Sequence, residues 1–207
     1  MNPLASATSQ PRALLVLEDG TTFEGRCCGA SGETFGEIVF NTSMTGYQEI
    51  ISDPSYAGQI VTLTYPQVGN YGIDPAVMQR DVLHLRGFVV HDMCYEPSNW
   101  TSKQSLPEFL QENGVVAIEG IDTRALTMHL RDHGAQKAAI STEDLDPAHL
   151  LARVQASPSI SEHNFVPDVS VDAPHMVTAT SKKRFNVVAY DCGEKNGILQ
   201  GLAANGC

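Results

Sequence analysis

Short apolar runs separated by glycine or polar residues fill the first part of the chain and predict β-strands. The clearest signal is the Asp19-Gly20 pair, which favours a tight hairpin turn between two such runs. The last run ends at Pro66, because proline cannot donate to a sheet ladder. The expected strands are residues 13–17, 22–28, 37–41 and 59–65.

Beyond residue 87 the pattern changes to short strands that alternate with helical segments. Ser105 and Glu108 have the spacing of a capping box, in which each residue satisfies a free backbone amide at the start of a helix. Expected strands are residues 88–91 and 115–118, and expected helices begin at the caps Ser105, Asp122 and Asp146 and end near Gly114, Gly134 and residue 156. The alternation indicates a mixed α/β fold.

The end of the chain resembles the start of a second domain. Residues 157–184 lack a regular period and contain several prolines, which is typical of a linker. An apolar strand at 185–190, a turn at Gly193 and a helix at about 195–204 would then form one βα unit. Such a unit cannot bury its own faces, so either more chain follows or this end is poorly ordered. The expected organisation is a disordered tail at 1–12, a first domain at 13–156, a linker at 157–184 and a truncated domain at 185–207.

Composition and charge narrow the classes of partner. The chain has 207 residues, and the 42% that are hydrophobic suffice for a core. Because 24 acidic side chains outnumber the 13 basic ones, the chain would repel nucleic acid and anionic lipid. No apolar run approaches the roughly 20 residues that span a bilayer, and the first residues lack the apolar region of a signal peptide. Five cysteines, an odd number, suit free thiols. We expect a cytoplasmic protein with no membrane or nucleic-acid partner.

Two pairs of residues have the types that bind metals or carry redox chemistry, but each pair also has a structural interpretation. His129 and His133 stand four apart on a predicted helix, a spacing that two metal ligands could use, but no third ligand is evident. Surface imidazoles at a helix C-terminus are the simpler interpretation. Cys27 and Cys28 are adjacent and would point to opposite faces of a strand, so core or edge positions are favoured over a redox pair.

Two further segments carry polar residues of uncertain role. Asp122, Thr123 and Arg124 form a cluster, although a helix start explains Asp122 by itself. The long segment 40–72 is rich in small polar residues and glycine, as are loops that build binding surfaces. Within it Ser55 lies in an Asp-Pro-Ser-Tyr turn, where its hydroxyl either bonds to nearby backbone or contacts a ligand.

Several of these stretches together resemble one family, the small subunit of carbamoyl phosphate synthetase. The similarity rests on ALLVLEDGTTFEGR, GEIVFNTSMTGYQEIISDPSY, QIVTLTYPQVGNYG and GIDTRALTMHLRDHGA, in that order, while FNVVAYDCGEKNGIL resembles the start of the family's amidotransferase domain. The last stretch departs from the family's DFGxKxNI pattern, since Cys192 replaces phenylalanine and Gly197 replaces asparagine. Gly197 would cost a helix about 1 kcal/mol relative to alanine.

The resemblance implies a fold and an activity. The fold is a three-layer β/β/α domain of the swivelling type, joined to a flavodoxin-like class I glutamine amidotransferase domain. In the family a cysteine thiolate releases ammonia from glutamine, assisted by a His-Glu pair, and the large subunit makes carbamoyl phosphate from that ammonia with bicarbonate and ATP for pyrimidine and arginine biosynthesis. The implied partners are the large subunit and L-glutamine, with no cofactor in this subunit, because ATP and Mg belong to the large one.

Very little of that active site maps onto this chain. The serine of DPSY, here Ser55, is the position where the family's first domain touches glutamine. No cysteine has the flanking glycines of the nucleophile elbow, so no catalytic residue is expected before residue 207. Two hypotheses remain: an amidotransferase subunit whose reading frame continues with that elbow, or a catalytically incomplete fragment that only docks onto the large subunit.

Overall fold

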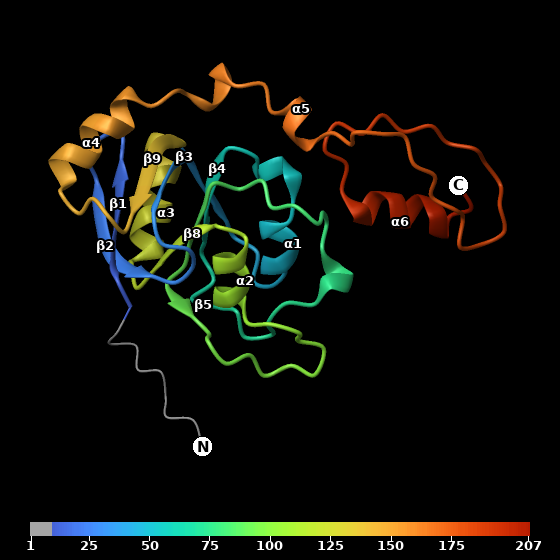
Figure 1. Ribbon diagram of the computed structural model, residues 1–207, viewed down its shortest axis with the longest axis horizontal. Helices are drawn as coiled ribbons and strands as arrows, with labels where there is room; N and C mark the ends of the chain where they lie inside the picture. Colours follow the sequence, from blue (N-terminus) through green and yellow to red (C-terminus); the bar gives the residue numbers. More distant parts are fainter. Residues whose placement is uncertain (1–9) are drawn as a thin grey trace.

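The computed structural model describes residues 10–207 and has a mixed α/β fold, as predicted (Figure 1). Its strands are β1 (Arg12–Leu17), β2 (Thr22–Cys27), β3 (Glu33–Asn41), β4 (Gln59–Leu63), β5 (Gln67–Val68), β6 (Gly87–Val89), β7 (Asp92–Met93), β8 (Val116–Glu119) and β9 (Gln136–Ser141). Its helices are α1 (Tyr47–Ile51), α2 (Leu106–Glu112), α3 (Thr123–His133), α4 (Pro147–Ala156), α5 (Val166–Val169) and α6 (Asn196–Ala204), with 3-10 turns η1 (Pro54–Tyr56), η2 (Pro75–Val77) and η3 (Ile160–Glu162). The expected tail at 1–12 lies mostly outside the described residues, and Arg12 already begins β1.

Seven strands close into a barrel in the order β1-β2-β8-β6-β4-β3-β9, and β9 pairs with β1 to complete it. The strands β3, β4, β6 and β8 run parallel to one another, whereas β1, β2 and β9 pair antiparallel with their neighbours. Strands β5 and β7 form a separate parallel pair. The carboxyl ends of four parallel strands therefore meet at one end of the barrel.

The barrel interior is filled by aliphatic side chains from alternate positions of its strands. Leu15, Ile38, Ile60 and Ile140 are fully buried and belong to one cluster. Helix α3 adds Leu126 and Leu130 to the same cluster, since these residues lie one turn apart on its apolar face. Helix α3 is thus part of the interior core and not only a surface covering.

Helices cover the outer faces of the barrel on two sides, as Figure 1 shows. On one side Val61 and Phe88, which point outward from β4 and β6, pack with Leu106 and Leu110 of α2 and with Ile51 of α1. On the other side Leu14, Val16 and Ala139 of β1 and β9 pack with Leu150 and Val154 of α4. Strands with both faces covered carry few polar residues, which agrees with their apolar sequences.

The predicted helix caps are confirmed by hydrogen bonds. The Ser105 hydroxyl accepts the Glu108 amide, and the Glu108 carboxylate accepts the Ser105 amide, which completes the capping box of α2. The Asp122 carboxylate accepts the Ala125 amide at 2.8 Å, and Asp146 caps α4 in the same way. These local signals are visible in sequence because all partners lie within a few residues of each other.

Two predictions about the end of the chain need correction. Residues 185–190 form no strand; Val188 and Tyr190 are 87% and 92% exposed. A strand requires a neighbour to receive its backbone hydrogen bonds, and within residues 10–207 this segment has one backbone bond, from the Phe185 amide to the Gly206 carbonyl at 3.0 Å. Residues 157–184 are not wholly irregular either, because they contain η3 and α5. The helix predicted after Gly193 is confirmed as α6, despite Gly197 within it.

Strand β9 is the longest of the elements that the sequence pattern misses, which also include α1, β5, β7 and α5. Its residues Ala138, Ala139 and Ile140 are fully buried between β1 and β3, so both of its faces lie in the core. Alanine has low β-propensity, and the short buried run 138–140 shows no alternation of apolar and polar residues. Its strand state comes from the two neighbours that it joins, which are distant in sequence.

Candidate functional site

Ser55 lies in the 3-10 turn η1, which follows helix α1 and precedes strand β4. Asp53 caps this turn, because its carboxylate accepts the Ser55 amide at 2.9 Å, and Pro54 occupies the first helical position. The Ser55 side chain is exposed, and its hydroxyl makes no hydrogen bond within residues 10–207. The turn therefore uses the backbone of Ser55 and leaves its hydroxyl available to another group.

The same turn contacts the segment that follows the predicted linker. The second oxygen of Asp53 lies 3.2 Å from the ammonium nitrogen of Lys195. Gly193 lies against Pro54 and Val169, where a Cβ would approach Val169 to 2.9 Å. Residues 191–197 are thus held beside Ser55, although they are about 140 positions away in sequence.

An ion pair between Arg80 and Asp191 reinforces this contact. The guanidinium Nη2 lies 2.5 and 2.6 Å from the two carboxylate oxygens, and the two side chains are only 19% and 9% exposed. The Asp191 carboxylate also accepts the amides of Gly193 and Glu194, each at 2.9 Å. Burial alone would raise the pKa of Asp191, but the hydrogen bonds from Glu194 and Arg80 outweigh it and hold that pKa below its ordinary value.

Backbone and amide contacts extend the same junction to α6. The Asn196 amide donates to the Gln79 carbonyl at 3.2 Å, and the Asn196 side chain donates to the Met78 carbonyl. The Gly197 amide donates to the Gln79 side-chain oxygen. Together with the two ion pairs these bonds form what we call the junction clamp, made of Asp53, Met78, Gln79, Arg80, Asp191, Lys195, Asn196 and Gly197.

Sequence reasoning predicted Ser55 as a ligand contact, which stays a prediction, and it missed the junction clamp. Arg80 gives no signal, because its partner Asp191 is 111 residues away and nothing local requires an arginine there. Asp191 and Lys195 lie in the stretch that carries the family resemblance, but their partners could not be read from it. A clamp between distant segments becomes visible only once the fold is known.

The other candidates have structural partners. The His129 Nε2 lies 2.6 Å from Asp19, and the His133 Nδ1 lies 2.9 Å from the His129 carbonyl oxygen, so each imidazole is engaged locally. No cluster of three or more metal-binding side chains occurs among residues 10–207. Burial raises the pKa of the Cys28 thiol, which packs in the core beside α2. All five cysteines lie in the described part of the chain and are free.

The described residues therefore define a mixed α/β protein, with a closed barrel clamped to a following segment that carries helix α6. A family model for the carbamoyl-phosphate synthase small chain, CPSase domain, matches residues 15–140, which include almost all of the barrel, whose strands begin at Arg12 and end at Ser141. The chain belongs to that family.

Curated relatives extend the similarity over almost the whole chain. Those named carbamoyl phosphate synthase small chain include proteins of Syntrophotalea carbinolica (48% identical, 95% of this chain, 55% of the relative) and Nitratidesulfovibrio vulgaris (49%, 94%, 56%). The Thermotoga maritima protein of the same name is 50% identical over 92% of this chain and 48% of its own length. The chain thus spans about half the length of the curated relatives it matches.

One solved structure, a psychrophilic subtilisin-like protease from an Antarctic Pseudoalteromonas, covers 93% of this chain and 49% of its own. Its TM-score of 0.32 and identity of 10% are too low to support any argument about fold or function.

Among residues 10–207, no helix combines the length and apolar character that crossing a membrane would require.

Proposed function

We propose that this chain is part of the glutamine-using small subunit of carbamoyl phosphate synthase, in which a further domain hydrolyses glutamine and the ammonia passes to the large subunit. The observation that carries the proposal is family membership over residues 15–140, together with identities of 48–50% to relatives of that name. The glutamine substrate, the large-subunit partner and a cytoplasmic location follow from the family. ATP and Mg would act on the large subunit, with no cofactor in this one.

The finer fold assignment is part of the same proposal. The two arcs of the barrel would supply the two β layers of a swivelling-type domain, and α1 and α2 on the outer face of β4 and β6 would supply its helical layer. Residues 185–207 would begin the flavodoxin-like amidotransferase domain. The exposed apolar residues Phe185, Val187, Val188 and Tyr190 support this, because a parallel neighbour would cover them and turn the run into a strand.

Ser55 is the proposed contact of this domain with glutamine. Its exposed hydroxyl can donate to the substrate carboxylate or accept from the substrate amine, and the Asp53 cap fixes the direction of the turn. The junction clamp holds the turn beside residues 191–197, which lead into the proposed amidotransferase domain. A substrate bound in that domain would therefore be within reach of a residue from the first one.

The test uses the complete reading frame from which this chain comes, combined with the large subunit. Carbamoyl phosphate formation should depend on glutamine, and Ser55→Ala should raise the KM for glutamine about 5- to 50-fold, the loss of one or two hydrogen bonds. The matched control is Ser43→Ala, another exposed serine of the same long segment. Ammonia-dependent synthesis should stay unchanged in both variants. Glutamine-independent behaviour of the wild-type enzyme would refute the assignment.

The alternative, a large-subunit docking module without glutaminase activity, is favoured for the 207-residue chain taken alone. No cysteine in it lies between the two glycines of a nucleophile elbow. The isolated chain should release no ammonia from glutamine yet retain association with the large subunit. Hydrolysis of glutamine by the purified 207-residue chain would exclude the hypothesis that it only docks onto the large subunit.

A further inference from the structure

A cleft of about 620 Å³ opens where α3 meets the carboxyl ends of the parallel strands. Thr42, Thr64 and His91 follow β3, β4 and β6 on one wall. Residues of α3 and its cap form the other wall: Asp122, Thr123, Arg124, Thr127, Met128 and Arg131. Pro66 completes the lining. We call this the α3 cleft; it is distinct from Ser55 and the junction clamp, which contribute none of its lining.

The charge of the α3 cleft is opposite to that of the chain as a whole. The chain carries a formal net charge of −11, yet two arginines face this cleft. Arg124 has no ion-pair partner within residues 10–207. Arg131 pairs with its neighbour Asp132, but both side chains are more than half exposed, and such pairs are worth only about 0–1 kcal/mol. The Arg124 guanidinium group is free to bind an anion, and the Arg131 group can exchange its exposed pair with Asp132 for one.

The helix end itself does not supply the binding groups. The Asp122 carboxylate already accepts the Ala125 amide, so the first turn of α3 is capped from within. The donors available are side chains: the hydroxyls of Thr42 and Thr64 and the guanidinium groups. Asp122 is the one acidic residue of the lining, and its carboxylate already caps α3. The lining therefore carries two arginines and one carboxylate.

A buried threonine close to the cleft lining adds an independent indication. Thr64 lines the cleft and directly follows β4, and Thr62 lies two residues earlier, within that strand. Thr62 is fully buried, and its hydroxyl has no hydrogen-bond partner in the described part of the chain. Buried polar atoms nearly always have a partner, so an unused hydroxyl next to a polar cleft indicates hydrogen-bonding capacity that the protein does not fill itself.

One hydrogen bond fixes the tautomer of the His91 ring, which lines the cleft. Its Nδ1 lies 2.8 Å from the carbonyl oxygen of Ile121, and a carbonyl can only accept, so Nδ1 carries a proton. The Nε2 is left for a ligand, as an acceptor in the neutral ring and a donor in the protonated one. A ligand that presents both oxyanions and a hydroxyl proton would satisfy the whole lining.

We infer that the α3 cleft binds a small molecule that carries a phosphate or carboxylate group, held by Arg124 and Arg131 with the strand-end threonines. A volume of about 620 Å³ falls in the range of about 300–1,000 Å³ typical of small-molecule sites. Planar guanidinium groups recognise such oxyanions by paired hydrogen bonds, which lysine could not reproduce. This inference concerns residues outside the proposed glutamine contact and does not depend on it.

The test is an NMR titration of the 207-residue chain with inorganic phosphate and with citrate, at constant ionic strength held by chloride. Amide signals of Thr64, Thr123 and Thr127 should shift and saturate with at least one probe. Arg124→Met should weaken that binding about tenfold, because one charge-assisted hydrogen-bonded pair is lost. Arg12→Met is the matched control, since Arg12 pairs with Glu24 on the distant surface of β1 and β2 and should leave the affinity unchanged.

Each possible result of the titration either supports or refutes the proposed site. Saturable shifts that Arg124→Met weakens and Arg12→Met does not would support the site. Shifts that rise linearly with either probe, or that both variants change equally, would overturn it. Because Arg124 is exposed and makes no ion pair in the described structure, its replacement should leave the fold intact, which unchanged signals of the buried β8 amides would verify.

Discussion

The junction clamp makes a prediction about local stability that can be worked out from its geometry. The variant is Asp191→Asn, which keeps the shape of the side chain and the oxygen that accepts the amides of Gly193 and Glu194, but removes the charge that faces Arg80. Removing one partner of a fully buried pair costs about 3–5 kcal/mol, and an exposed pair is worth about 0–1 kcal/mol. With side chains 19% and 9% exposed, we expect about 2–3 kcal/mol.

That energy should appear as local opening of residues 191–204 and not as global unfolding. Few apolar contacts hold this segment, since Ala203 is its only buried apolar residue in the described structure. Amides of α6 should exchange with solvent roughly 30- to 150-fold faster in Asp191→Asn, which is the factor that 2–3 kcal/mol corresponds to. Amides of β8 in the barrel should be unaffected. In the wild type, α6 should already exchange faster than residues 115–118.

The pH dependence has a definite sign. The pKa of Asp191 is lower in the folded protein than in the unfolded chain, so its contribution is fully present above about pH 4 and is lost as the pH falls through the folded value. The difference between wild type and Asp191→Asn should therefore shrink in acid. Arg80→Met should have little further effect in the Asp191→Asn background, and Lys195→Met, which breaks a pair 42% exposed on the lysine side, should cost less than 1 kcal/mol. Equal acceleration of α6 and β8 exchange, or none at all, would refute this account.

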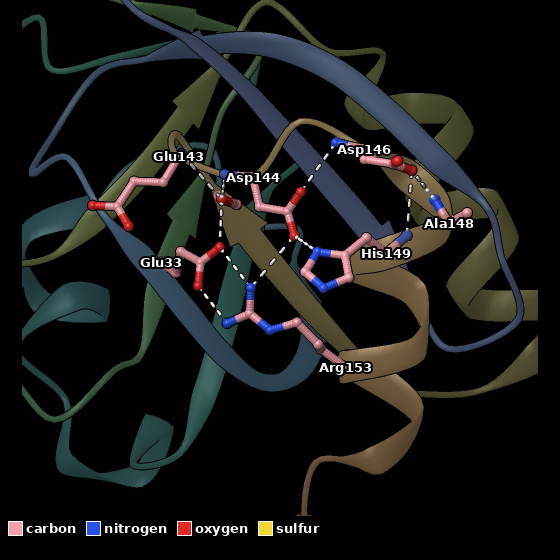
Figure 2. Close-up of polar contacts among 8 residues, drawn as sticks. Glu33, Glu143, Asp144, Asp146, Ala148, His149 and Arg153 are labelled. Carbon is pink, nitrogen blue, oxygen red and sulfur yellow. Dashed lines mark hydrogen bonds and ion pairs between the residues drawn. The ribbon is translucent and has the colours of Figure 1, made fainter.

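Three more predictions concern the barrel and its attachments. Arg153 reaches Glu33 and Asp144 in Figure 2, and its replacement by methionine should lower the midpoint of urea unfolding more than the exposed Arg12→Met does. Because the Arg153 hydrogen bond lowers the pKa of Glu33, that contribution should be present at neutral pH and disappear as the pH falls below about 4.5. Gly58→Ala should lower the free energy of unfolding by about 2–4 kcal/mol, and the melting temperature with it, since Gly58 has φ +81° and its Cβ would lie 2.3 Å from the Phe165 ring; Phe165→Ala should relieve the clash but not the backbone strain. Asp122→Ala should cost about 1 kcal/mol through loss of the α3 cap, and a circular dichroism melt that showed no change would contradict the capping argument.

How much of this structure the sequence could predict depends on how far apart the interacting residues are. Caps and turns, such as Ser105 with Glu108, are written within four positions and were predicted correctly. Strands with strongly apolar or alternating runs, such as β1 and β4, were also found. Closure of the barrel was not foreseen, because it depends on β9, whose residues Ala138 and Ala139 acquire their strand state from pairing with β1 and β3.

The end of the chain shows the opposite error. Residues 185–190 have the composition of a buried parallel strand, and the prediction assumed neighbours that the described residues do not supply. Composition reports where a segment would be stable, whereas its observed state depends on the partners that are present. The same reasoning explains the candidate site: Ser55 was recognisable from a local motif, but Arg80 was not, because its role exists only across the junction.

The position of Ser55 gives the junction clamp its functional meaning within the proposed activity. A hydroxyl on one domain can contribute to binding a substrate held by another only if the two are kept in a constant relation, since a displacement of 1 Å is enough to lose a hydrogen bond. The Asp53 carboxylate meets both requirements at once: one oxygen fixes the Ser55 amide, and the other pairs with Lys195 across the junction. The turn that presents the hydroxyl and the contact that sets its distance from the next domain thus share a single side chain. Replacing Asp53 would therefore disturb the direction and the distance of Ser55 together, whereas Asp191→Asn disturbs the distance alone.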